Sequence, residues 1–407
     1  MHQPMKGVRV LEVAQFWFVP SAGAVLADWG ANVIKVEHPE RGDGQRGLAT
    51  SGVATEIGGV DFLVQQPNRG KRSLALDFGR PEGLELLYQL AAKSDVFLTN
   101  FLPDARARLR IDVADIRKVN PRIIYVRGHG QGARGPEAHL GGYDASSFWS
   151  RGGICDALTP AGAAQPTGQR AAFGDGIGGM TIAGGIAAAL FARERTGAGS
   201  VVDISLLNTA MWVLSPDIIA SSLLPAEMKT LPTVTRKKMF NPGVNSYKTR
   251  DERWVMLVML QTDRYWADFC RRIGRPELAT DPRYRDMKAR FENREACIAE
   301  LDAVFATRTL DEWRAAFDDM EGPWAPVQKA RELLADRQAL ANGYVQQVDG
   351  GKRGRFPLVT NPVQFDETPP TLSRGPEWGE HTDEVLQSEL GVPMDALLEY
   401  KAKGVIL

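Results

Sequence analysis

The sequence predicts an α/β fold in which an open parallel sheet is followed by a smaller domain. Residues 8–13 and 32–37 are β-branched runs, and residues 21–30 between them have a helical pattern. A strand, a helix and a strand within thirty residues form a unit whose strands run parallel. Further strands are expected at 73–77, 95–98 and 123–126, separated by helical segments, so the alternation continues to residue 130. Such alternation is typical of an open parallel sheet.

The first connections of this sheet carry the usual helix signals. Ser21 is expected to cap the first helix, Gly30 to end it, and Pro81 to open the helix that runs to residue 93;. Residues 15–20 occupy the turn where a G-x-G-x-x-G motif would stand, which disfavours a nicotinamide or flavin enzyme. Residues 42–72 have weak periodicity and are expected to form a long surface excursion.

A change of composition divides the chain, whose 407 residues exceed one ordinary domain;. Residues 1–215 are assigned to a large domain, and the proline-containing stretch 216–245 to a linker. Residues 246–330 are expected to form a small domain, with a buried strand at 254–260 and amphipathic helices at 263–273, 288–307 and 310–319;.

Composition excludes several classes of protein. The chain has 49 basic and 50 acidic residues, so no attraction to nucleic acid or to a membrane surface is expected;. Its three cysteines and five histidines show no disulfide or metal-ligand spacing, and we expect no metal;. The N-terminal residues have no apolar signal core, and the apolar run after Asp175 is judged too short and glycine-broken to span a bilayer;. We therefore expect a soluble, cytoplasmic protein.

One carboxylate stands in a glycine-rich setting. Asp175 lies in the stretch FGDGIGGM at 173–180, ahead of an alanine-rich helical run. It is either a helix cap or a nucleophile that attacks an activated acyl group, with backbone N–H groups of the glycines holding the oxyanion. Asp144 in GGYD is the second candidate.

Candidate ligand-binding residues are expected just beyond the strand ends, where open sheets bind ligands. They are Gln15, Phe16 and Trp17 after the first strand, then His38, Arg72, Asn100 and Arg127. The recurrence of basic residues among them favours a ligand that carries phosphate.

The whole chain resembles the class III CoA-transferases, the family of formyl-CoA transferase and carnitine CoA-transferase, which also includes α-methylacyl-CoA racemases. The matching stretches include LADWGANVIKVE at 26–37, NRGKRS at 68–73, FGD at 173–175 and GEHT at 379–382. The resemblance implies an interlocked homodimer with a Rossmann-like large domain, which residues 331–407 return to complete around an inserted small domain.

The resemblance also implies the chemistry. Asp175 would be the nucleophile, passing through mixed anhydrides and an aspartyl-CoA thioester, with an acyl-CoA and a carboxylic acid as substrates and no tightly bound cofactor. The implied CoA contacts are Gln15, Phe16, His38, Arg72, Asn100, Arg108 and Arg127.

Tyr143 separates the subfamilies. The racemases have a Gly-His-Asp triplet where this chain has Gly142-Tyr143-Asp144, and a tyrosine with its ordinary pKa of about 10 is a poor base;. Transfer is therefore favoured over racemisation, unless His129 or His139 reaches Asp175. A CoA-binding protein without catalysis is a third alternative, which the intact aspartate disfavours. Five aromatic residues are either core or the lining of an acyl pocket: Phe16, Trp17, Phe18, Phe148 and Trp149.

Overall fold

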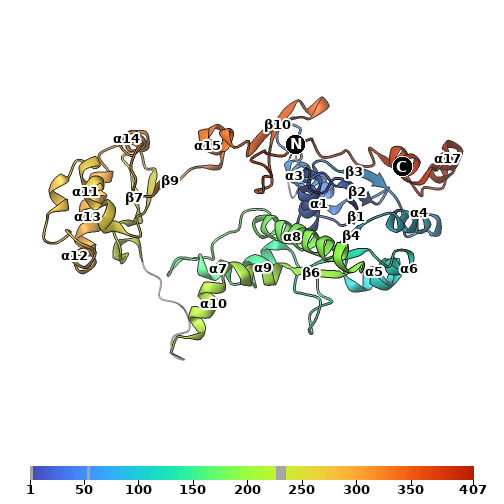
Figure 1. The fold of residues 1–407 in the computed structure, drawn as a ribbon, viewed down its shortest axis with the longest axis horizontal. Coiled ribbons are helices and arrows are strands. Elements are labelled where there is room, and N and C mark those ends of the chain that lie inside the picture. The colour runs from blue at the N-terminus through green and yellow to red at the C-terminus, as the bar shows by residue number, and fades with distance from the viewer. Residues whose placement is uncertain (1–2, 53–55, 226–234) are drawn as a thin grey trace. The chain divides into compact units, whose positions relative to one another are not determined.

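The computed structural model describes residues 3–52, 56–225 and 235–407. The chain forms two compact units (Figure 1). The large unit combines Met1–Lys229 with Arg337–Leu407, and the small unit comprises Thr230–Asp336.

The large unit is built on a six-stranded parallel sheet with the order β3-β2-β1-β4-β5-β6. Its strands are β1 (Arg9–Val13), β2 (Asn32–Glu37), β3 (Arg72–Ala75), β4 (Val96–Thr99), β5 (Ile124–His129) and β6 (Val201–Ser205). The chain builds outward from β1 to β3 on one side and then from β4 to β6 on the other. This confirms the predicted open parallel sheet and places the reversal of strand order between β1 and β4.

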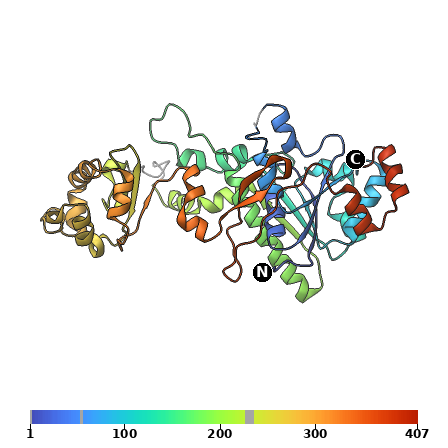
Figure 2. The ribbon, with the colours of Figure 1, turned by 90° about the horizontal axis from the view of Figure 1, so that it is seen from above.

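Side chains alternate along each strand, and the two faces of the sheet bury different helices. On one face, Val10 packs with α1 (Phe18–Asp28) and α8 (Phe173–Thr196). On the other, Leu11 packs with α4 (Pro81–Ala92) and α16 (Thr382–Leu390). The sheet is therefore the middle layer of three, and Figures 1 and 2 show α16 and α17 (Met394–Ala402), in red, beside the α4 side.

The remaining elements of the large unit lie at its edges and ends. They are α2 (Gly44–Thr50), α3 (Phe62–Asn68), α5 (Pro103–Leu109), α6 (Val113–Val119), the π-helix η1 (Asp144–Ser150), α7 (Ile154–Ala157), α9 (Leu206–Val213), α10 (Ser215–Ser222), α15 (Arg337–Ala341), the antiparallel pair β10 (Val345–Asp349) and β11 (Arg355–Val359), and η5 (Gly351–Arg353). Residues 42–72 are thus not a structureless excursion. They contain α2 and α3, whose first turns are capped by Asp43 and Asp61.

Two helix predictions need correction. The first helix begins at Phe18 rather than after Ser21, because Phe18 and Val19 are drawn into the core and Pro20 is tolerated in a first turn;. The helix after Asp175 was judged too short to span a membrane, but α8 has 24 residues and reaches the length and hydropathy of a span. In this structure α8 packs against α1 and the sheet.

The small unit has its own antiparallel sheet, in the order β7 (Val244–Lys248), β8 (Trp254–Val258) and β9 (Trp324–Pro326). Its helices are η2 (Arg236–Lys238), α11 (Thr262–Arg272), η3 (Pro276–Ala279), α12 (Met287–Glu292), α13 (Arg294–Phe305), α14 (Leu310–Ala316) and η4 (Ala330–Ala335). Stacked aromatic side chains such as Tyr247 and Phe305 fill its core. Of the expected linker 216–245, residues 226–234 lie outside the described residues, and the rest includes most of α10, η2 and the start of β7.

Candidate active site

The turn after β1 lies where the strand order reverses. The Asn100 side chain, just beyond β4, joins the two strand ends: its Oδ1 accepts the N–H of Gln15 at 3.0 Å and its Nδ2 donates to the carbonyl of Gln15 at 2.7 Å. The predicted position of both residues beyond the strand ends is confirmed, although the Asn100 amide is engaged by the chain itself. This is the edge at which open α/β sheets bind ligands.

Asp175, in the first turn of α8, lines a cavity of about 310 Å³ at this edge. The other lining residues come from the turn after β1, the start of α1, the loop after β4 and α5, the end of β5, the segment 138–144 and the start of α9. They are Gln15, Phe16, Phe18, Asn100, Phe101, Leu102, Ala105, Gly128, His129, Gly130, Ala138, Leu140, Gly141, Gly142, Tyr143, Asp144 and Leu206.

Asp144, and not Asp175, is the carboxylate that caps α8. Both oxygens of Asp144 accept the N–H of Gly174, at 3.1 and 3.0 Å, although Asp144 comes from a segment thirty residues earlier. The residue at the N-cap position of α8 is Ala172, which has a left-handed backbone and offers no side-chain oxygen;. The interpretation of Asp175 as a simple helix cap is therefore wrong, and its carboxylate is left for the cavity.

The environment of Asp175 opposes its negative charge. Burial and, second, the charge of the nearby Asp144 together raise the pKa of Asp175 from 3.8 to about 8. Burial also raises the pKa of Asp144, against the hydrogen bonds that it accepts. Within the described part of the chain, no hydrogen bond reaches the Asp175 carboxylate. A carboxylate that is little stabilised as an anion is basic and, once ionised, reactive toward an acyl carbon.

The glycines that follow Asp175 serve helix packing. A Cβ on Gly178 would lie 2.3 Å from the Phe18 ring, and one on Gly179 would lie 1.8 Å from Ser21 Oγ, so both allow α8 to approach α1 closely. Gly176 donates its N–H to the carbonyl of Ala172 at 3.0 Å, within the helix. The expectation that these glycines form an oxyanion loop is therefore wrong, because the stretch is helical and its N–H groups are used by the helix.

A second cavity, of about 360 Å³, adjoins the same turn and shares Gln15 and Phe101 with the first. His38, Arg41 and Arg108 line it, and both arginine side chains are exposed. Burial and the charge of Arg41 lower the pKa of His38. Arg108 and Arg41 have no ion-pair partner among the described residues. Arg41 was not predicted; the sequence signal for it is its place in the turn that follows β2.

Two other expected CoA contacts lie elsewhere, and neither lines the two cavities described above. Arg72 opens β3 instead of following a strand, and its guanidinium binds Asn32 and the carboxylate of Glu389 on α16. Arg127 forms a two-pronged ion pair with Asp203 of the neighbouring strand, at 2.7 and 2.9 Å. A guanidinium that already pairs with a carboxylate has fewer donors for a phosphate.

Neither His129 nor His139 is hydrogen-bonded to Asp175 among the described residues, although His129 lines the same cavity. His129 Nε2 lies 2.9 Å from Asp203 Oδ1, and His139 is exposed on its loop. Tyr143 packs its ring edge-to-face on Phe16, with the centroids 5.3 Å apart. A histidine partner of the kind the racemases have is thus not hydrogen-bonded to Asp175 among the described residues, and the titratable group whose charge acts on Asp175 is the helix-capping Asp144;.

The five aromatic residues separate into two groups. Phe16 and Phe18 line the cavity with Asp175. Phe148 and Trp149 are buried in the core and pack edge-to-face on Phe173, and Trp17 is the residue that precedes α1. Across residues 3–52, 56–225 and 235–407, no three His, Cys, Asp or Glu side chains gather in a geometry that could hold a metal ion.

Comparison with known proteins gives consistent matches across the chain. The sequence pattern described as CoA-transferase family III matches residues 5–382. The (R)-2-hydroxy-4-methylpentanoate CoA-transferase of Clostridioides difficile is 30% identical over 405 residues, covering 99% of each chain. The cinnamoyl-CoA:phenyllactate CoA-transferase of Clostridium sporogenes is 31% identical, covering 95% of this chain and 93% of the relative. A crystal structure of a CAIB/BAIF family protein from Brucella suis superposes with a TM-score of 0.81 at 28% identity, over 96% of this chain and 100% of the other.

Proposed function

This chain belongs to CoA-transferase family III, whose pattern it matches from residue 5 to residue 382, and on that premise we propose that Asp175 is the nucleophile of the transfer. The enzyme moves CoA between an acyl-CoA and a carboxylate. The observation that supports Asp175 is its carboxylate at the cavity beyond the sheet edge, partly buried beside Asp144 and without a protein hydrogen bond among the described residues. No other carboxylate except the helix-capping Asp144 lines that cavity.

The proposed reaction forms and breaks one bond at each step. The Asp175 carboxylate attacks the thioester carbonyl of the donor, giving an acyl-aspartyl anhydride and releasing CoA thiolate. The thiolate then attacks the aspartyl carbonyl, which releases the donor acid and leaves an aspartyl-CoA thioester. The acceptor carboxylate repeats the two steps in reverse, so that the new acyl-CoA leaves and Asp175 is restored. Splitting the exchange in this way replaces one difficult step by easier ones.

We propose that the two cavities hold different parts of CoA. Arg41 and Arg108 supply cationic donors of the kind that bind phosphate groups, and His38 adds a neutral ring beside them, so the second cavity suits the phosphorylated end;. Gln15 and Phe101 line both cavities, and the pantetheine arm would pass them to bring the sulfur to Asp175.

The acid that the enzyme accepts is proposed to be a small apolar monocarboxylate. Phe16, Phe18, Leu102, Leu140 and Leu206 line the cavity beside Asp175. No lysine or arginine does so among the described residues, and a second carboxylate would find no cation to pair with;. The volume of about 310 Å³ is at the small end of ligand sites, which span roughly 300–1,000 Å³;. The two relatives named above are named for a branched and for an aryl-substituted acid.

Covalent trapping tests the role of Asp175. The protein is incubated with a donor acyl-CoA and then with hydroxylamine or borohydride, and the modified peptide is mapped by mass spectrometry. The adduct should fall on Asp175, and Asp175→Asn should lower the rate roughly 10³–10⁶-fold, the scale for loss of a covalent nucleophile. Asp156→Asn, at an exposed position on α7 outside the cavity, is the matched control. An unmodified Asp175 in an active enzyme would defeat the assignment, and α-proton exchange without an acceptor acid would indicate racemase chemistry instead.

We also propose that the protein is a homodimer. Trp212 and Leu223 are each 79% exposed and Ile219 is 61% exposed, around α9 and α10, and α10 buries no residue in the single chain. An apolar patch of this kind is typical of a surface that a partner covers. Light scattering after size-exclusion chromatography should give a dimer mass that Trp212→Lys converts to a monomer. Leu398→Lys, at an exposed leucine on α17, should leave the dimer intact.

A further inference from the structure

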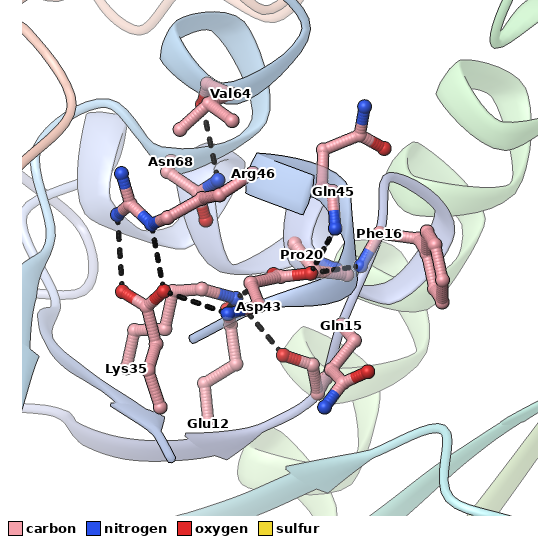
Figure 3. Close-up of polar contacts among 12 residues, drawn as sticks. Glu12, Gln15, Phe16, Pro20, Lys35, Asp43, Gln45, Arg46, Val64 and Asn68 are labelled. Carbon is pink, nitrogen blue, oxygen red and sulfur yellow. Dashed lines mark hydrogen bonds and ion pairs between the residues drawn. The ribbon is translucent and has the colours of Figure 1, made fainter. Parts of the chain in front are cut away.

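Phe16 has a backbone conformation that its residue type avoids. Its φ is +65°, in the left-handed region, which is costly for a bulky side chain and persists only where the surroundings hold it;. Its N–H donates to Asp43 Oδ1 at 2.9 Å, and the same oxygen accepts the N–H of Gln45 at 2.8 Å. Figure 3 shows the two backbone nitrogens converging on this carboxylate. One carboxylate thus caps α2 and also holds the turn after β1.

Asp43 is itself fixed by a buried lysine. Its Oδ2 lies 2.7 Å from Lys35 Nζ, and that ammonium also donates to the carbonyl of Ala14 at 2.9 Å and to Glu12 Oε1 at 3.3 Å. Lys35 and Glu12 are fully buried and Asp43 is 2% exposed. Burial opposes the charge of Lys35, but the surrounding carboxylates, Asp43 first among them, raise its pKa. A buried ion pair of this kind has one favourable geometry, which fixes the direction of the Asp43 carboxylate.

Three successive residues of the turn are therefore held at their two shared peptide groups by side chains from different elements. Lys35 of β2 holds the carbonyl of Ala14, Asn100 beyond β4 holds both polar groups of Gln15, and Asp43 holds the N–H of Phe16.

The held turn carries Gln15, which lines both proposed substrate cavities, and Phe16, which lines the cavity with Asp175. The Phe16 ring lies between Tyr143, with centroids 5.3 Å apart, and the backbone of Gly44, where a Cβ would lie 2.8 Å from the ring. Rotation of the Phe16 backbone toward ordinary φ values would move the ring out of this slot and redirect Gln15.

We propose that Asp43 is a positioning residue of the transfer reaction, which holds Phe16 in the left-handed conformation and so fixes Gln15 and the Phe16 ring beside Asp175. This inference rests on the proposed function. Asp43 lines neither cavity, so it acts through the turn and touches no substrate.

The experiment compares Asp43→Ser with Asp61→Ser. Asp43 and Asp61 each cap a seven-residue helix through a backbone N–H, and serine is a comparable cap, but Asp61 holds no residue of the turn;. Asp43→Ser should lower kcat about 10- to 100-fold and change KM for the acyl-CoA less than threefold, because the cations of the second cavity are untouched. Asp61→Ser should keep kcat within twofold. Equal kcat in the two variants would overturn the inference.

One further measurement remains decisive if Asp43→Ser does not fold, and a second applies where it folds. Asp43→Asn keeps an oxygen for the Phe16 N–H while removing the charge that faces Lys35, so it should melt earlier yet keep kcat within threefold; a tenfold loss would refute the role. Glycine adopts φ +65° without strain. In a Phe16→Gly background, Asp43→Asn and Asp43→Ser should therefore each change kcat less than threefold. If Asp43→Ser lowered kcat in that background as much as it does in the parent, the positioning role would be contradicted.

Trapping of the acyl-enzyme separates this inference from the proposed function. If the parent enzyme gives no adduct at Asp175, the proposed nucleophile is wrong. If the parent is labelled at Asp175 and Asp43→Ser is labelled at the same rate, the positioning role alone fails.

Discussion

The ionisation of Asp175 can be shifted by replacing its neighbour Asp144 with asparagine. Asparagine has the size of aspartate, and its Oδ1 can still accept the N–H of Gly174 that Asp144 accepts at about 3 Å. It also caps a helix about as well as aspartate does. The substitution therefore removes one negative charge near Asp175 while keeping the start of α8 in place.

The structure sets the size of the effect. With the pKa of Asp175 raised to about 8, first by burial and second by Asp144, roughly a tenth of the carboxylate is ionised at pH 7 and about a hundredth at pH 6;. The kcat/KM for the donor should therefore rise about tenfold per pH unit and level off above pH 8. Asp144→Asn removes only the second cause, so its profile should move to lower pH by about one unit while staying well above the ordinary aspartate range.

The assay is the pH profile of kcat/KM for one acyl-CoA between pH 5.5 and 9.5, measured for the parent and for Asp144→Asn in buffers of constant ionic strength. A parent profile that is flat from pH 6 to 9 would refute the proposed ionisation of Asp175. If the rising part of the kcat/KM profile lay at the same pH in Asp144→Asn as in the parent, the two carboxylates would not interact.

The same burial affects stability with a definite sign. The folded pKa of about 8 lies above the ordinary 3.8, so the protonated carboxyl is favoured in the fold; this contribution is fully present below about pH 4 and is lost progressively as the pH rises from about 4 to 8;. At pH 7 the loss, discounted for partial exposure, is on the order of 2–4 kcal/mol. Asp175→Asn should therefore melt several degrees above the parent at pH 8, and the difference should vanish near pH 4.

Three further outcomes follow from the packing and the cavities. Gly179→Ala should lower the free energy of unfolding by about 2 kcal/mol or more, because its Cβ would meet Ser21 Oγ at 1.8 Å;. Gly184 faces open space on the same helix, so Gly184→Ala should raise the free energy of unfolding by up to about 1 kcal/mol;. Urea denaturation measures both variants, and equal effects would contradict the close packing of α8 on α1. Arg108→Gln should raise KM for the acyl-CoA about tenfold with little change in kcat, because Arg108 lines the second cavity;. Arg72→Gln should lower the melting temperature and leave KM within twofold, because Arg72 pairs with Glu389. A raised KM in Arg72→Gln and an unchanged KM in Arg108→Gln would instead put the phosphates near Arg72. In a panel of acceptor acids followed by mass spectrometry, branched and aryl monocarboxylates should exceed C4 and C5 dicarboxylates in kcat/KM by at least tenfold, and a preference for dicarboxylates would place an unrecognised cation at the site.

The strands of the sheet were predictable because their signals are local. Residues 8–13, 32–37 and 95–98 are apolar, short and bounded by turns, and the structure has β1, β2 and β4 there. Gln15, His38 and Asn100 could be placed at the ligand-binding edge by the same reasoning, since each directly follows such a strand.

The errors arise where distant segments decide the outcome. Asp175 resembles a helix cap in the sequence, but the cap is supplied by Asp144, and no local pattern links the two. The glycines after Asp175 favour a loop in the sequence, but in the structure they lie in α8 and let α1 pack closely against it. Arg72 stands directly before the strand expected at 73–77 and pairs with Ile34 at the start of β3, so it lies at the opposite end of the strand from the ligand-binding edge. Its ionic partner, Glu389, lies 317 residues away, where no local pattern could indicate it.

The edge of the sheet at β3 is completed by the far end of the chain. His381 Nδ1 accepts a hydrogen bond from the N–H of Ser73 at 3.2 Å, and Thr382 Oγ1 accepts one from the N–H of Ala75 at 3.0 Å. Leu76 forms an antiparallel β-bridge with Ile406. At about 5–20 residues per second, a ribosome needs roughly 15–60 s to add the three hundred residues between these partners. During that time the nascent chain has an uncovered strand edge, the kind of surface through which polypeptides aggregate. Synthesis of this protein in a heterologous host should therefore benefit from slower initiation or from a chaperone that holds the first half of the large unit until residues 381–406 emerge.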